Sequence, residues 1–231
     1  GLLAATADRV PCARGGSPDL HGMPTRLEQV EEVVYASSPQ AFERVFGRLL
    51  DSRGYGERWA RHWLDLVGYA DQIGTANDIF AEQAWRYRDW VIDAFNRDLP
   101  YDEFVRLQLA GDVLRPGDAE PIIATGFLTA GPWDEVGQKQ QSAAMKLVVR
   151  QDELANMVST IGQTFLGLKV NCARCHDPQF DPLRQMESYQ LTAALAAVHP
   201  GTPSLSTTPV PSSQDLKSTS LHPRHNGYST P

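Results

Sequence analysis

The sequence is poor in cysteine, in basic charge and in long apolar runs, and each shortage excludes a class of protein. Three cysteines among 231 residues are too few for a disulfide-rich secreted scaffold, so packing must hold the core together. A formal net charge of −7 argues against a nucleic-acid partner, which would require a basic face. No apolar run approaches the ~18 residues of a membrane-spanning helix, so we expect a soluble chain without a membrane span.

The first residues also lack the features of an export signal. The stretch "GLLAATADRV" is short and has no basic start. Because the chain starts at Gly1 rather than Met, we allow for a signal that has been removed or that precedes this sequence. The hydrophobic content of 42% is enough for one sizeable core, or for a main domain with a smaller annex.

Apolar residues recur with helical spacing from about residue 25 to residue 198, without a convincing strand pattern. The predicted fold class is therefore mainly α, an irregular multi-helix domain. Helices are expected from Thr25, from Ser38, over "ERWARHWLDLVGYAD", "AEQAWRYRDWVIDAFNRD" and "YDEFVRLQLAGD", over residues 143–168, and over "MESYQLTAALAAV".

Two of these helices carry expectations that bear on a site. Gly54 and Gly56 predict a turn before the third helix. Within that helix, His62 is expected on the inward face, in a stripe with Trp59, Trp63 and Leu66. The long helix over 143–168 leads the chain directly to a pair of cysteines.

The ends of the chain lack helical periodicity, which predicts three segments. Residues 1–18 are expected to be a flexible N-terminal segment with a lone thiol at Cys12. Residues 19–198 form the helical domain. Residues 199–231 hold six of the sixteen prolines, with many Ser and Thr residues, so we expect a linker or a disordered tail.

The segment "NCARCHDPQFDPL", Asn171 to Leu183, carries the clearest functional signal. Two residues separate Cys172 from Cys175, and His176 follows directly. Two sulfurs at this spacing can each form a thioether with one vinyl group of a haem, and the next imidazole can then bind the iron axially. The motif predicts Cys172 and Cys175 as covalent anchors of haem c, near the C-terminal end of the domain, and His176 as the proximal iron ligand.

Zinc binding, dithiol redox chemistry and chance are the alternative interpretations of the two cysteines. A structural zinc site takes four ligands, usually from two pairs, and the sequence has no second pair. Redox dithiols usually stand at the start of a helix in a βαβ unit, which the pattern does not predict. We favour haem attachment.

Several longer blocks resemble the planctomycete cytochrome c-like domain family, in the order in which they occur there. The resemblance covers about residues 19–198. Its blocks are "GYGERWARHWLDLVGYAD", "AWRYRDWVIDAFNRDLPYDEFVRLQLAGD", "IIATGFLTAGPWD" and "TFLGLKVNCARCHDPQFDPL". The segment "DLHGMPTRLEQVEEVVYASSPQAFERVFGRLLDS" resembles the family's opening, which usually reads closer to Asp-Leu-Thr-Gly-Leu-Pro.

The resemblance implies a mostly helical, haem-binding domain of larger exported proteins, usually followed by a further domain. It therefore implies a periplasmic or otherwise exported location, but no defined reaction. Many members have a second histidine two residues beyond the haem histidine, where this chain has Pro178, so that position is assigned no ligand role. The stretch around Cys12 matches only loosely, and Cys12 is assigned no role.

The motif does not identify the sixth iron ligand. The candidates are His62, Met186 and His199, and an open site is the remaining possibility. We predict His62 as a tentative distal ligand, because it is expected among aromatic side chains on an inward helical face. A histidine that only packs within the core is the alternative for this residue.

Together these observations favour a c-type haem domain that transfers electrons to an unidentified redox partner protein, rather than a catalyst. The first alternative is a peroxidase-like haem enzyme with an open distal site, which would need acid–base groups near the iron. The second is a structural or docking module of a larger exported protein.

Overall fold

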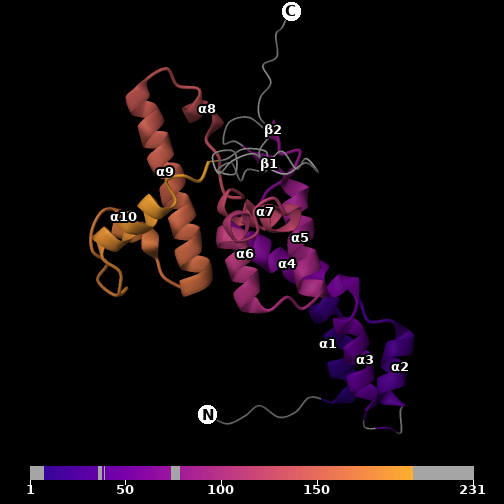
Figure 1. Ribbon diagram of the computed structural model, residues 1–231. Helices are drawn as coiled ribbons and strands as arrows, with labels where there is room; N and C mark the ends of the chain where they lie inside the picture. The colour runs from indigo at the N-terminus through magenta and orange to yellow at the C-terminus, as the bar shows by residue number, and fades with distance from the viewer. Residues whose placement is uncertain (1–7, 36–37, 39, 74–78, 200–231) are drawn as a thin grey trace, which may run out of the picture. The chain divides into compact units, whose positions relative to one another are not determined.

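The structure is a computed structural model that describes residues 8–35, 38, 40–73 and 79–199. Helices dominate these residues, which confirms the mainly α prediction (Figure 1). The described residues divide into two compact units, one within residues 8–63 and 91–99 and the other within residues 64–90 and 100–199. None of the described helices is long and apolar enough to cross a membrane. The predicted tail lies outside the described residues, except for His199.

Three short helices form the N-terminal part of the first unit. They are α1 (Arg9–His21), α2 (Leu27–Val34) and α3 (Ala41–Leu50). Helix α3 buries Ala41, Val45 and Leu49, which lie one turn apart and so share one face. The small core between the three helices consists of Ala13, Val33, Val45 and Leu49, with Leu20 and Phe46 packed against it.

Helix α1 covers most of the described part of residues 1–18, where the sequence predicts a flexible segment. The prolines and glycines of this stretch have low helix propensity, but packing against α3 overrides it. Gly16 lies against the ring of Phe46, where a Cβ would be 2.2 Å from Phe46 Cζ. Glycine is therefore the residue that lets α1 approach α3 this closely.

A proline inside α1 is tolerated because a side chain replaces its missing hydrogen bond. Pro18 has no N–H, so it cannot donate to the carbonyl of Arg14 one turn earlier. Thr25 Oγ1 donates to that oxygen instead, at 3.0 Å, and to Ala13 O at 3.1 Å. The segment that follows α1 thus completes its hydrogen bonding.

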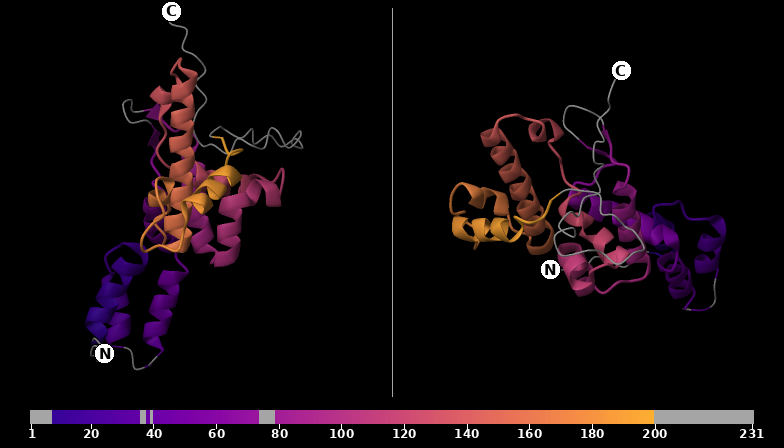
Figure 2. Two further views of the ribbon diagram at one scale, coloured as in Figure 1. Left: turned by 90° about the vertical axis from the view of Figure 1, so that its left-hand side faces the viewer. Right: turned by 45° about the horizontal axis from the view of Figure 1, so that its top comes forward.

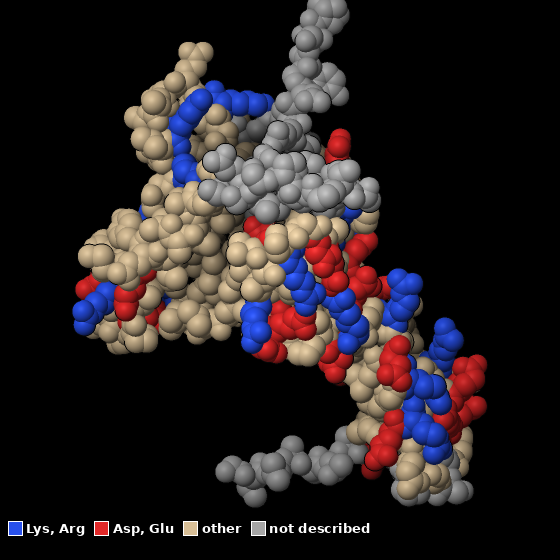
Figure 3. Space-filling model, viewed as in Figure 1, with Lys and Arg blue, Asp and Glu red and all other residues tan. Residues whose placement is uncertain are grey.

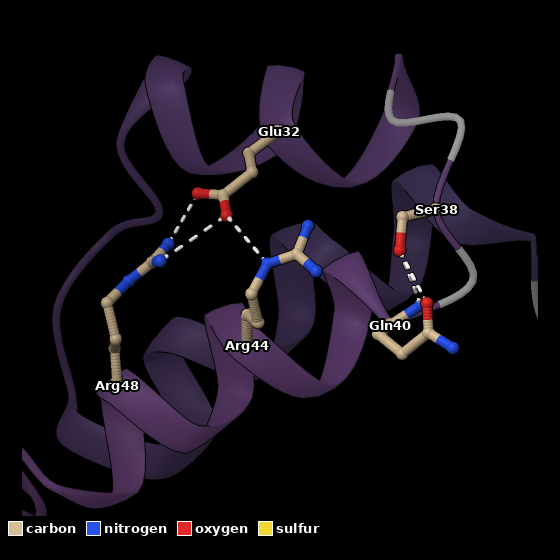
Figure 4. Close-up of polar contacts among 5 residues, drawn as sticks. All are labelled: Glu32, Ser38, Gln40, Arg44 and Arg48. Atoms are coloured by element: carbon tan, nitrogen blue, oxygen red, sulfur yellow. Dashed lines mark hydrogen bonds and ion pairs between the residues drawn. The ribbon is translucent and has the colours of Figure 1, made fainter.

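A carboxylate on α2 joins that helix to α3 (Figure 4). Glu32 Oε1 accepts a hydrogen bond from Arg48 Nη1 at 3.3 Å, and Arg48 Nη2 pairs with the other oxygen. Arg44 Nε lies 4.0 Å from the same carboxylate. The hydrogen bond from Arg48 lowers the pKa of Glu32. These groups lie at the surface, so they fix the orientation of the helices more than they stabilise the fold.

Helix α4 (Arg53–Val67) begins earlier than the sequence predicts. The expected turn at Gly54 and Gly56 is absent, because both residues lie inside the helix. Asn96, at the end of α5 (Ala84–Asn96), explains the early start. Gly56 N donates to Asn96 Oδ1 at 2.8 Å, and Asn96 Nδ2 donates to Arg53 O at 3.3 Å. This side chain satisfies polar backbone groups in the first turn of α4.

The buried face of α4 also differs from the predicted one. Trp63 is buried, but Leu66 is 59% exposed and Trp59 is partly exposed. His62 is exposed, so the prediction that it faces inward is wrong. The buried residues are Ala60, Trp63, Leu64 and Val67. Counted from Ala60, the others follow after three, four and seven residues, as on one face of a helix. This face is shifted by one residue from the expected one.

The second unit is built around α6 (Tyr101–Leu114), which packs against α7 (Ala119–Ala124) and the 3-10 turn η1 (Thr125–Leu128). Tyr87 on α5 and Gln108 on α6 are fully buried, and Tyr87 OH donates to Gln108 Oε1 at 2.7 Å. Two two-residue strands that the sequence does not predict, β1 (Gln72–Ile73) and β2 (Ile79–Phe80), form an antiparallel pair.

The C-terminal part of this unit contains α8 (Glu135–Gln138), α9 (Ala143–Ile161) and α10 (Gln185–Ala194). Figure 2 shows α10 lying beside α9, and the two helices are in contact. Helix α9 is shorter than the predicted helix over 143–168, and a π-helical turn, η2 (Gly162–Leu166), follows it. The helical spacing predicts that Leu147, Val148 and Leu154 lie on one apolar side of this helix, but Leu147 and Val148 are exposed, whereas Leu154 is buried.

Candidate haem-attachment site

The cysteine motif lies where the chain turns from α9 towards α10. Leu168 N donates to Gly162 O at 3.0 Å, which closes the end of α9. Gly162 is buried, and a Cβ there would lie 2.0 Å from Val170 Cγ2. The absence of a side chain therefore lets Val170 pack against the end of the helix. This contact anchors the turn that carries the cysteines.

Cys172 and Cys175 are held by a single 3-10 turn, η3 (Val170–Arg174), with Cys175 as its C-cap. Cys175 N donates to Cys172 O at 3.3 Å. Side chains three residues apart in such a turn lie on the same side. Both cysteines are exposed, whereas Ala173 between them is 0% exposed. The turn thus buries its small residue and presents two thiols to the solvent.

His176 follows the turn and is also exposed. Its Nδ1 lies 3.0 Å from the carbonyl oxygen of Asp177. Because a carbonyl can only accept a hydrogen bond, Nδ1 is the nitrogen that carries the proton. The lone pair of Nε2 is then available to a metal ion.

Helix α10 supports the motif through Gln185 and Tyr189. Gln185 Nε2 and Tyr189 OH donate to Arg174 O at 3.0 and 3.2 Å. Gln185 N donates to Asp177 Oδ1 at 2.7 Å. The segments just before and just after His176 are therefore both hydrogen-bonded to the first turns of α10.

Helix α9 supports the same turn from another direction. Arg174 Nη2 lies 2.6 Å from Asp152 Oδ1. No local pattern in the sequence marks Asp152, Gln185 or Tyr189 as supports, because their partners lie eight to 22 residues away in the chain.

The comparison with protein families decides the identity of the domain. A model of the family described as "PSCyt2: Protein of unknown function (DUF1549)" matches residues 3–200. The chain belongs to this planctomycete cytochrome c-like domain family. The match starts earlier than the resemblance at residue 19, so α1 is part of the PSCyt2 domain. Neither a curated protein nor a solved structure matches the chain.

The residues around the motif of this PSCyt2 domain fit a haem better than a bare metal ion. Within the described residues, no group of three or more His, Cys, Asp and Glu side chains could hold a metal ion. Four large apolar side chains that are close to the motif in the sequence are exposed, and in Figure 3 the mostly uncharged face over α10 borders a cluster of Lys, Arg, Asp and Glu side chains. These exposed residues are Leu166, Phe180, Met186 and Tyr189. Two thiols and one imidazole are the groups through which a protein attaches and ligates haem c.

The candidate distal ligands have different positions. His62 belongs to the first unit of the PSCyt2 domain, and the motif belongs to the second. Met186 is the second residue of α10, next to the hydrogen-bonded Gln185, and it is exposed. His199 is exposed at the end of the described chain. Cys12 is half-buried on α1, away from the motif in the sequence.

Proposed function

We propose that the chain is a c-type haem domain that transfers single electrons within an exported protein. The observation that carries this proposal is the geometry of η3. Cys172 and Cys175 lie on one exposed side of a single turn, and His176 follows with Nε2 available. Membership of the PSCyt2 family supports it.

Each residue of the motif has a distinct task in this proposal. Cys172 and Cys175 would each hold the haem through one thioether, which forms when the thiol S–H adds across a vinyl group without a leaving group. Nε2 of His176 holds the iron, while the carbonyl of Asp177 keeps the proton on Nδ1 and orients the ring. When bound, the haem supplies one-electron exchange between ferrous and ferric iron.

The side chains that bind η3 would keep the proposed haem-attachment site rigid. Arg174 is fixed through its side chain by Asp152 and through its carbonyl by Gln185 and Tyr189. A turn held at several points keeps the imidazole and both sulfurs in one arrangement. A fixed arrangement suits an electron carrier, because little of the surrounding protein has to move when the charge on the iron changes.

Intact mass and absorption spectra test the attachment directly. The full chain is expressed in a host with haem-maturation machinery. We expect a mass increase of one haem and a Soret band. Cys172→Ser and Cys175→Ser should each lose one thioether, and the double variant should lose covalent haem. Cys12→Ser is the matched control and should retain it. A bare polypeptide mass in this host would contradict the proposal.

The distal ligand is tested by the same spectra. We compare His62→Phe, at the ligand expected from the sequence, with Met186→Leu, at the exposed methionine of α10. The variant that converts low-spin ferric haem to high-spin identifies the ligand. If the parent is already five-coordinate and high-spin, the electron-carrier proposal gives way to a haem enzyme with an open site.

A further inference from the structure

Asp177 makes two contacts that together join His176 to the start of α10. Its carbonyl oxygen lies 3.0 Å from His176 Nδ1, and its carboxylate oxygen Oδ1 accepts a hydrogen bond from Gln185 N at 2.7 Å. The first contact uses the backbone of Asp177 and the second uses its side chain. A single residue therefore connects the predicted iron ligand to a helix.

The start of α10 lacks its usual capping group. The first backbone N–H groups of a helix have no partner within that helix, and the N-cap residue usually satisfies one of them through a side-chain oxygen. Arg184, the N-cap of α10, forms no such bond. Asp177 accepts from the N–H of Gln185 instead, from eight residues earlier in the chain. Its negative charge is favourable at the positive end of the helix dipole, so this contact holds the Asp177 side chain in place.

The next residue restricts the backbone of Asp177. Pro178 follows it, and a proline ring disfavours the α conformation of the residue before it and favours an extended one. The Asp177 carbonyl, which belongs to the peptide bond with Pro178, therefore has few orientations. The hydrogen bond from Gln185 N to the Asp177 side chain selects the one in which this carbonyl reaches the imidazole.

We propose that Asp177 is a positioning residue for His176. Its carboxylate, held at the N-terminus of α10, fixes the carbonyl that keeps the proton on Nδ1, so that Nε2 retains its lone pair. Without this carboxylate the carbonyl can turn away, and the proton can move to Nε2, which then cannot bind a metal ion. This inference rests on the proposed function, because a fixed tautomer matters where Nε2 binds iron.

The tautomer of His176 can be measured in the chain without haem. Nitrogen NMR spectra of the isotope-labelled full chain are recorded at about pH 8.5, where histidine side chains are neutral. Comparison with His176→Gln protein assigns the signals of this ring. The Nδ1–H form should predominate in the parent. Asp177→Ala should lower the ratio of Nδ1–H to Nε2–H by about two- to tenfold, the factor that corresponds to one hydrogen bond.

Three further variants separate positioning from charge and from general support of the turn. Asp177→Asn keeps an oxygen that can accept from Gln185 N, so it should retain the parent ratio. Asp181→Ala removes a carboxylate from the same loop and is the matched control for charge. Tyr189→Phe removes a hydrogen bond to Arg174 O without changing Asp177, and both controls should retain the ratio. An unchanged ratio in Asp177→Ala protein, or an equal fall in any of these three variants, overturns the proposal.

The haem-loaded chain provides a second measurement. A hydrogen bond from Nδ1 makes the imidazole a stronger donor to the iron, which favours the ferric state. The reduction potential of Asp177→Ala protein should therefore lie above that of Asp177→Asn protein, which has the same net charge. Equal potentials of these two variants overturn the proposal. If the chain takes up no haem, the proposed function fails, and the NMR ratio alone decides whether Asp177 positions His176.

Discussion

Arg174 Nη2 lies 2.6 Å from Asp152 Oδ1, and this ion pair joins the cysteine turn to the middle of α9. The Arg174 side chain is 35% exposed and that of Asp152 is 53% exposed, so solvent screens their attraction. The pair therefore contributes little to the free energy of unfolding. The pair matters because it fixes a position: Arg174 lies between Cys172 and Cys175 in the chain, and Asp152 belongs to α9.

The first prediction concerns the strength of this pair. In a double-mutant cycle with Arg174→Met and Asp152→Asn, we expect a coupling free energy of about 0.2–1 kcal/mol. Added salt should reduce it, since both groups are partly exposed. Urea unfolding of the four proteins gives the value. A coupling well above about 2 kcal/mol would show that the pair is a main structural element.

The second prediction concerns the buried residue between the two cysteines. Ala173→Leu adds volume at a position that is 0% exposed, so we expect destabilisation by about 1–3 kcal/mol from overpacking. The displaced turn should also reduce haem attachment. Asn171→Leu places the same side chain at an exposed position two residues earlier and should have little effect. Denaturant midpoints and intact mass measure the two consequences.

The third prediction concerns a buried hydrogen bond in the second unit. Tyr87→Phe removes the donor to Gln108 Oε1 while keeping the ring. Because both residues are fully buried, we expect a loss of about 1–3 kcal/mol in the free energy of unfolding. Tyr69→Phe removes a comparable bond to the exposed Asp71 and should cost less. Equal effects of the two substitutions would contradict this reasoning.

The fourth prediction concerns pH. Burial raises the pKa of Glu153 above its usual value of 4.5, against the effect of Arg150. The folded state then binds more protons than the unfolded state at pH values between the two pKa values, so this carboxyl reduces stability as pH rises through that window. Glu153→Gln removes the effect. The free energy of unfolding of the variant, minus that of the parent, should therefore increase from about pH 4.5 upwards.

The same pH series tests whether the pH dependence comes from Glu153 or from the charged groups near it. Arg150 donates a hydrogen bond to Glu153, and Asp134 and Asp152 line one pocket together with Glu153. All three residues therefore contribute to the charge around Glu153. Asp102→Asn on α6 serves as the reference for a general change of net charge. A variant whose stability follows that of the parent at every pH would show that burial does not raise this pKa.

The sequence predicts the features that depend on neighbouring residues. Helix α3 is predicted from the helical spacing of its apolar residues, Ala41, Phe42, Val45, Phe46, Leu49 and Leu50, although Phe42 and Leu50 are exposed in the structure. The turn η3 carries a motif that is recognised by its spacing. Such patterns are local, since each residue is compared only with others one or two turns away.

The features that depend on distant partners were not predicted. Helix α1 contains glycine and proline, and it forms because Phe46 packs on Gly16 and Thr25 replaces the hydrogen bond that Pro18 lacks. The early start of α4 depends on Asn96, about 40 residues further along the chain. Helix propensity does not include such contacts, so it underestimates these segments.

Because Cys172 and Cys175 are both exposed, their oxidation state affects when the proposed haem could be attached. Two neighbouring thiols on the protein surface are as accessible to oxidants as they are to a cofactor. In an oxidising compartment the two thiols can form a disulfide, and neither sulfur can then form a thioether. If the proposed haem is attached in such a compartment, a reductant must first act on Cys172 and Cys175.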